Sequence, residues 1–213
     1  FNVFLKPSQL TIPTQTHDYP EWHLGREEYA VWYLEIHQPD LLEYLTQLRT
    51  EFSEFLFQPN TRQFHITLFI CGFLTQQDPV LNDDFSIEQL TQQLQQLKNK
   101  NIQPFQLTVG NIQSFESALF VDVLDCQNSL SKIRNLFSKT HHEIAPLNYH
   151  PHITIGIYKE VFKSERIFAK IAAITPQKFE ISVEHLSFGL YKAKQLQGQL
   201  YPYQQFYLAK NDR

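Results

Sequence analysis

The sequence FHITL at residues 64–68 recurs almost unchanged as PHITI at residues 151–155. Side chains in an extended strand alternate between two faces, so His65 and Thr67 share one face while the apolar residues beside them occupy the other. The same alternation places His152 and Thr154 together. Each segment is therefore expected to be a strand that offers an imidazole and a hydroxyl on one face and aliphatic side chains to a core.

The segments around these two strands alternate between strand and helix patterns. Runs of β-branched and aromatic residues predict strands at 29–36, 63–71, 104–115, 118–124, 151–158, 179–191 and 201–208, with Gly72 ending the second. Apolar residues at helical spacing predict helices that begin near residues 40, 86, 128 and 164; Asp40 and Ser86 are the expected N-caps, and the third helix is expected to reach His141. Strands mixed with helices and at least two hairpins indicate an α+β fold.

Residues 1–28 differ in character from the rest of the chain. They carry prolines at positions 7, 13 and 20 and no sustained periodicity, which predicts an arm lying on the surface. The expected organisation is an N-terminal arm at 1–28 followed by a single domain at 29–213.

The composition limits the classes of function. Of the 213 residues, 42% are hydrophobic and 19% charged, as in soluble globular proteins. The net charge of −4 disfavours tight binding of long duplex nucleic acid. Residues 1–127 hold 6 Lys or Arg and 16 Asp or Glu, whereas residues 128–213 hold 12 and 6. The basic second half could favour a small anionic ligand, and a mixed surface with a chance gradient explains it equally well.

The compartment expected from the sequence is a reducing cytoplasm. The longest apolar run, residues 66–74, is shorter than the roughly 18 residues of a membrane span, and the first residues lack the pattern of a signal peptide. Two cysteines, Cys71 and Cys126, are too few for a disulfide scaffold and lack the spacing of metal ligands. No contact with a membrane is expected.

Two imidazoles and two hydroxyls suit one kind of chemistry if the motif strands lie side by side. One neutral histidine can deprotonate an attacking water while the other, protonated, donates to the leaving oxygen. Threonine hydroxyls can hydrogen-bond the phosphate oxygens in the transition state. The expected reaction is hydrolysis of a phosphodiester with no metal and no cofactor, and a cyclic phosphate of ribose is a natural substrate.

These motifs resemble those of the 2H phosphoesterases, which include RNA 2′,5′-ligase-like proteins and cyclic nucleotide phosphodiesterases. The family carries two His-x-Thr/Ser motifs on the inner strands of two pseudo-symmetric lobes. Residues 65–72 (HITLFICG) look like its HxTLxFLG, and residues 151–155 look like its PHxTL. The element order agrees from Tyr29 to Leu208. Many bacterial ligase-like members have an arginine five residues after the second histidine, where this chain has Ile157.

The resemblance implies a fold, a site and a substrate class. The fold is a two-lobed α+β domain with a central cleft between two antiparallel sheets and helices outside. Catalytic roles fall to His65, Thr67, His152 and Thr154, with His152 as the base and His65 as the acid. The substrate is a nucleotide or RNA end carrying a 2′,3′-cyclic or 1″,2″-cyclic phosphate. A 2′,5′-linked oligonucleotide is the main rival substrate, and a non-catalytic nucleotide- or RNA-binding module is the rival from another class.

Several further residues could take part, each with a plainer explanation. Aromatic side chains near the motifs could stack on a nucleobase or simply pack in the core: Phe73, Tyr149, Tyr158 and Tyr191. Lys192 and Lys194 could touch phosphate or end a solvated strand.

A cluster of His141, His142, Glu143, His150 and His152 could hold a metal in a metallohydrolase, but adjacent histidines at a helix end face different ways, so no metal site is expected. His150-Pro151-His152 is similar to the histidine-triad hydrolases, although Thr154 stands at the third histidine. A monomer is expected.

Overall fold

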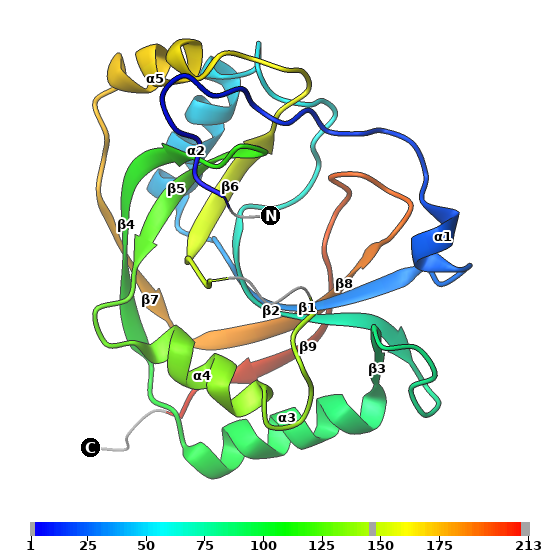
Figure 1. Ribbon diagram of the computed structural model, residues 1–213. Helices are drawn as coiled ribbons and strands as arrows, with labels where there is room; N and C mark the ends of the chain where they lie inside the picture. Colours follow the sequence, from blue (N-terminus) through cyan, green and yellow to red (C-terminus); the bar gives the residue numbers. More distant parts are fainter. Residues whose placement is uncertain (1–2, 145–147, 210–213) are drawn as a thin grey trace.

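The structure is a computed structural model, and it describes residues 3–144 and 148–209. Its strands are β1 (Glu28–Glu35), β2 (His65–Thr75), β3 (Asp84–Ser86), β4 (Phe105–Ser114), β5 (Ala118–Leu124), β6 (His152–Ile157), β7 (Phe179–Val183), β8 (His185–Lys192) and β9 (Tyr201–Tyr207). Its helices are α1 (Pro20–His23), α2 (Pro39–Glu51), α3 (Ile87–Lys100), α4 (Ser129–Phe137) and α5 (Ser164–Ala172). The α+β class predicted from the sequence is confirmed (Figure 1).

The nine strands of the described residues belong to one strongly curved sheet in the order β7-β4-β5-β6-β2-β1-β8-β9, with β3 paired to β2. The sheet consists of two halves that meet where the motif strands β2 and β6 pair antiparallel, through Ile66 and Ile153. The two antiparallel sheets expected from the sequence are thus joined at the motifs into a continuous one. In each half the motif strand lies at the join, next to the strand that precedes it along the chain: β2 beside β1, and β6 beside β5.

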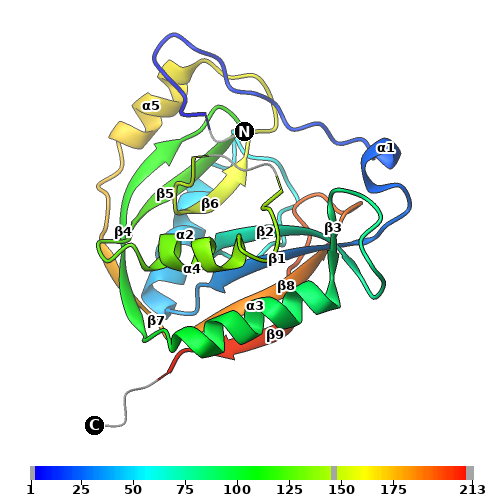
Figure 2. The same ribbon diagram turned by 60° about the horizontal axis from the view of Figure 1, so that its bottom comes forward.

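The helices cover the two halves in a crossed arrangement. Helix α2 precedes β2 in the chain but packs on β6 of the other half, and α4 precedes β6 but packs on β2. Figures 1 and 2 show α3 and α4 along one half and α2 and α5 along the other. Trp32 of β1 ties this packing together, because its ring stacks on Phe137 of α4 at 4.9 Å and its Nε1–H donates to Gln93 of α3 at 2.8 Å.

The predicted alternation of the motif strands is present. Ile66 and Leu68 of β2, like Ile153 and Ile155 of β6, are fully buried in the core formed by sheet and helices. The side chains between them point to the other, concave side of the sheet and are only half-buried. Burying a large aliphatic side chain contributes roughly 1.5–3 kcal/mol of hydrophobic free energy. The burial of these aliphatic residues therefore determines the face of the sheet on which each histidine lies.

Some predicted elements differ from the structure. The run predicted as one strand at 179–191 is two strands on distant parts of the sheet: β7 pairs with β4 at one edge, and β8 pairs with β1 in the other half. The chain crosses between the halves at Glu184. The sequence contains no glycine or proline at the crossing to mark it.

Gly72 does not end the second strand. It adopts a φ of +114°, and the register of β2 against β1 shifts there, so the glycine forms a bulge and β2 continues to Thr75 beside β3. A Cβ at this position would lie 2.3 Å from the carbonyl oxygen of Asp83. The glycine is therefore required by both its backbone conformation and this close approach.

Some of the predicted helix boundaries agree with the structure and others differ. Ser86 caps α3 as predicted, with both hydrogen bonds of the capping box to Gln89. Asp40 is not an N-cap: Pro39 occupies the first turn, so the cap moves to Gln38. Helix α4 ends at Phe137 rather than at His141. No helix in the described part of the chain has the length and apolar character needed to cross a membrane.

Candidate active site

The four motif side chains meet where the two halves of the sheet join. Because Ile66 pairs with Ile153 in antiparallel strands, His65 lies beside Thr154, and Thr67 lies beside His152. All four line one cavity of about 250 Å³. The structure therefore brings together the two imidazoles and two hydroxyls that the sequence placed 87 residues apart.

Both histidine rings are held in the same way. The Nδ1 of His65 lies 2.8 Å from the carbonyl oxygen of Gln63, and the Nδ1 of His152 lies 2.7 Å from the carbonyl oxygen of His150. A carbonyl oxygen only accepts, so Nδ1–H is the donor in each ring. This bond fixes the tautomer and leaves the Nε2 of each ring as the nitrogen that can exchange a proton with a substrate.

Burial makes both rings weaker bases than free histidine. It lowers the pKa of His65 to about 4, helped by the nearby positive charges of Arg62 and Arg49. It also lowers the pKa of His152, but there the carboxylate of Asp122 acts in the opposite direction. Both histidines are thus neutral in the unliganded protein at neutral pH, with His65 the harder of the two to protonate.

Two arginines not singled out from the sequence line the same cavity. The Nε of Arg49, from α2, donates to the carbonyl oxygen of Ile155 at 2.8 Å, and its guanidinium stacks on Phe64 at 3.9 Å. The Nε of Arg62 donates to the carbonyl oxygen of Gly198 at 2.9 Å. Within residues 3–144 and 148–209, neither guanidinium forms an ion pair with a carboxylate.

These two arginines give the cavity its positive charge. Burial lowers the pKa of Arg49 to about 10, which still leaves it protonated at neutral pH. Both arginines belong to the acidic first half of the sequence, so the basic second half does not supply the charge here. Ile157, at the place where many bacterial ligase-like proteins have arginine, lines the cavity without charge. Two fixed guanidinium groups beside two hydroxyls suit a phosphate.

The other aromatic candidates are distributed differently. Phe73 and Tyr158 are buried in the core, and the Tyr158 hydroxyl hydrogen-bonds Ser114. The Tyr149 hydroxyl donates to the carbonyl oxygen of Thr67. None of these three lines the cavity, whereas Tyr191 lies in a second cavity directly beside it.

Three of the residues considered as metal ligands have other partners. The Nε2 of His141 contacts the carbonyl oxygen of Cys71, Glu143 pairs with Arg134, and His150 pairs with Asp122 at 2.7 Å. Among the described residues, no group of three or more His, Cys, Asp or Glu side chains is placed to hold a metal ion.

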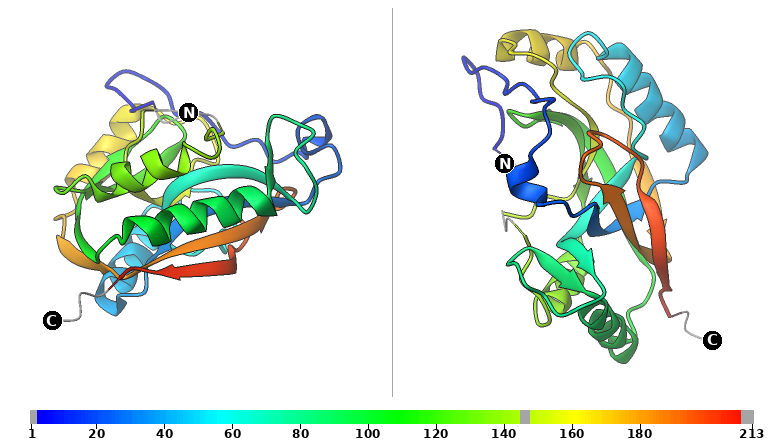
Figure 3. Two further views of the ribbon diagram at one scale, coloured as in Figure 1. Left: turned by 90° about the horizontal axis from the view of Figure 1, so that it is seen from below. Right: turned by 90° about the vertical axis from the view of Figure 1, so that its right-hand side faces the viewer.

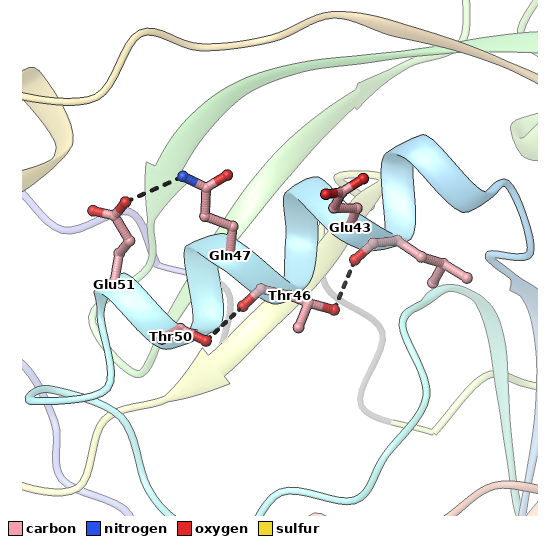
Figure 4. A pocket seen from close by; sticks show the side chains of 6 residues that line it. Glu43, Thr46, Gln47, Thr50 and Glu51 are labelled. Carbon is pink, nitrogen blue, oxygen red and sulfur yellow. Dashed lines mark hydrogen bonds between the residues drawn. The ribbon is translucent and has the colours of Figure 1, made fainter.

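A further hollow lies on the outer face of α2 (Figure 4). Its polar side chains bond within the helix: Thr46 and Thr50 donate to carbonyl oxygens one turn back, and Gln47 donates to Glu51 at 3.3 Å. It contains no imidazole and neither motif. The candidate active site is therefore the cavity that the motif residues line.

A curved sheet with a His-x-Thr strand in each half is the architecture of a 2H phosphoesterase. The sequence model of the 2′-5′ RNA ligase superfamily matches residues 37–195 of this chain. The chain belongs to that superfamily, and its family resemblance is confirmed. No match was found among curated protein sequences.

Solved structures show the same fold. The apo form of LigT from E. coli superposes with a TM-score of 0.59 at 14% identity, covering 87% of this chain and 100% of LigT. The protein TT0787 of Thermus thermophilus gives 0.57 at 14% identity, covering 86% and 99%. A conserved protein of unknown function from Agrobacterium tumefaciens gives 0.53 at 15% identity, covering 90% and 95%. LigT has also been solved with 3′-AMP, ATP and NADP⁺.

Proposed function

We propose that this protein hydrolyses a 2′,3′-cyclic or 1″,2″-cyclic phosphate on a nucleotide or RNA end, by acid–base catalysis with His65 and His152 and without a metal ion. The observation that carries the proposal is the single cavity lined by both motif histidines, both motif threonines and two arginines. Membership of a superfamily of phosphoesterases and ligases, and the nucleotides bound by the structurally similar LigT, support it.

The reaction adds one water to the phosphodiester. The base takes a proton from water as its oxygen attacks phosphorus, and the acid gives a proton to the ribose oxygen that leaves, so the product is a phosphomonoester. Thr67 and Thr154 donate to the non-bridging oxygens, and Arg49 and Arg62 offset their negative charge.

The electrostatic environments of the two histidines differ, and this difference favours a separate catalytic role for each. Burial lowers the pKa of both histidines, but the Asp122 carboxylate counteracts this effect at His152, whereas Arg62 and Arg49 reinforce it at His65. We therefore assign the base to His65 and the acid to His152, the reverse of the roles implied by the family resemblance. A bound phosphate anion raises both pKa values and brings them toward neutrality.

The test is incubation of the purified protein, with EDTA present, with nucleoside 2′,3′-cyclic phosphates, a 1″,2″-cyclic phosphate and 2′,5′-linked oligoadenylate, followed by chromatography of the products. Turnover of a cyclic phosphate in EDTA is the expected result. Turnover of the oligoadenylate alone would instead identify a 2′,5′-phosphodiesterase. Nucleotide binding without any product would indicate a binding module on the same fold.

A further inference from the structure

A second cavity, of about 260 Å³, opens directly beside the candidate active site. The two cavities share Arg62 and Gln197 in their walls. Each alone is smaller than the roughly 300–1,000 Å³ of a typical ligand pocket, whereas the two joined reach that range. A ligand that fills both would pass Arg62.

The second cavity is built by the N-terminal arm, which lies outside the part of the chain matched by the superfamily model. The arm contributes His17, Tyr19 and, from α1, Trp22, while β8 and the loop after it contribute Tyr191 and Lys194. Figure 3 (right) shows α1 and this orange loop on the same side of the molecule. Aromatic rings therefore reach the cavity from two separate parts of the chain.

The part of the arm that lines the cavity is anchored at both of its ends. On one side, the backbone N–H of Thr14 donates to the carbonyl oxygen of Tyr158 at 2.8 Å. On the other, Trp22 packs on Phe73 at 5.0 Å, and Arg26 pairs with Asp83 at 2.6 Å. A segment held in this way needs little further ordering when a ligand binds.

The lining matches a nucleobase better than a second phosphate. Rings supply flat apolar faces for stacking, and the amides of Gln195 and Gln197 supply donors and acceptors for the edge of a base. The amide oxygen of Gln15 instead accepts from the Tyr19 hydroxyl at 2.7 Å. The carboxylate of Asp18, which also lines the cavity, disfavours an anion and lies close enough to Lys194 to offset its charge.

Arg62 sits at the junction of the two cavities. Its guanidinium stacks on the Tyr191 ring at 4.3 Å, and its Nε is bound to Gly198. Its two terminal nitrogens make no hydrogen bond within the described residues. They are therefore free to hold a phosphate that lies between the histidines and the arm cavity.

We propose that the arm cavity binds the nucleobase of the nucleotide whose phosphate occupies the candidate active site, with Arg62 holding the phosphate between them. This inference rests on the proposed function for its substrate. It adds a base-recognition site contributed by residues 15–22, and it makes the arm a determinant of specificity.

The first experiment measures binding without turnover. Trp22 is 37% exposed, whereas Trp32 is fully buried and bound to Gln93, so a nucleotide in the arm cavity should quench mainly the Trp22 fluorescence. We expect adenosine 3′-monophosphate to quench it, and ribose 5-phosphate, which has no base, to do so far less. Tyr19→Ala should weaken the affinity for the adenosine nucleotide about 10-fold. Tyr19→Phe, which keeps the ring, should bind more tightly than Tyr19→Ala.

The matched control is Tyr207→Ala, which removes an exposed tyrosine of β9 that lines neither cavity. Equal affinity of the adenosine nucleotide for the wild type, Tyr19→Ala and Tyr207→Ala would overturn the inference. So would an absence of any nucleotide binding to the wild type.

The second experiment separates this inference from the proposed function. The ratio of kcat/KM for adenosine 2′,3′-cyclic phosphate to that for glycerol 1,2-cyclic phosphate, which has no base, should fall about 10-fold in Tyr19→Ala, through KM. Turnover with an unchanged ratio would overturn the base site and leave the phosphodiesterase. No turnover of either ester, with the 10-fold loss of nucleotide affinity intact, would overturn the phosphodiesterase and leave the base site.

Discussion

The first half of the sheet, β2-β1-β8-β9, and the second half, β6-β5-β4-β7, hold their histidines alike and surround them differently. In each, the ring donates from Nδ1 to the carbonyl oxygen two residues earlier, and a carboxylate stands opposite the histidine on the next strand: Glu35 opposite His65, and Asp122 opposite His152. Asp122 raises the pKa of its histidine, whereas the main charge effects on His65 come from Arg62, His152 and Arg49 and lower its pKa.

The residues two positions before the histidines also differ between the halves. The Gln63 side chain exchanges two hydrogen bonds, each of 2.9 Å, with the backbone of Leu200, so it ties the first motif to the loop before β9. His150 instead pairs with Asp122 and keeps a carboxylate near the second motif. A shared backbone geometry thus fixes where the rings lie, while burial and the nearby charges decide which ring is easier to protonate.

The largest expected effect is the loss of either histidine. His65→Ala and His152→Ala should each lower kcat on a cyclic phosphate by about 10²–10⁴-fold, because each removes a proton donor or acceptor from the transition state. Steady-state rates of the two variants measure this. Near-full turnover by either variant would show that the two halves do not both contribute a catalytic imidazole.

Loss of a motif threonine hydroxyl should lower kcat less than loss of a histidine, and by the same factor in the two halves. Thr67→Val and Thr154→Val keep the β-branched shape but lose the hydroxyl, so we expect about a 10²-fold lower kcat for each. Thr108→Val, on β4 away from the cavity, is the matched control and should keep the wild-type rate. A strong effect in only one half would show that the phosphate is held asymmetrically.

His65 should make the stability of the protein depend on pH. The pKa of His65 is lowered in the folded state to about 4, so the unfolded chain binds more protons between about pH 6.5 and pH 4. Its contribution to stability is present above this window and is lost as the pH falls through it, by about 1–3 kcal/mol. Urea unfolding of the wild type and of His65→Asn at several pH values should give a flatter dependence for the variant. An unchanged dependence would contradict a buried neutral His65.

The smallest expected effect concerns the carboxylates opposite the histidines. Asp122 raises the pKa of His152, so Asp122→Asn should move the basic limb of the kcat/KM profile, assigned to the acid His152, to lower pH by less than about one unit. Glu35→Gln, the equivalent change in the first half, should move neither limb. A shift of the acidic limb by Asp122→Asn would mean that His152 is the base and would restore the roles implied by the family resemblance.

Local sequence rules predicted part of the fold well. The period-2 alternation around Ile66 and Ile153 identified both motif strands and their faces, and the Ser86–Gln89 box marked the start of α3, because each depends on residues within one element. The same rules were wrong at 179–191, where one extended run serves two distant parts of the sheet. Strand partners depend on contacts far apart in the chain, and no local pattern encodes them.

By itself, the sequence determined that two His-x-Thr strands exist, which faces they present and which superfamily they indicate, because alternation and motif spacing are local properties. The tertiary structure alone brought Arg49 and Arg62 to the phosphate cavity, set the arm beside it and gave the two imidazoles different environments. Arg49 arrives through the packing of α2 across the opposite half of the sheet, and the pKa values follow from burial and from charges contributed by distant segments. Such effects exist only once the chain has folded.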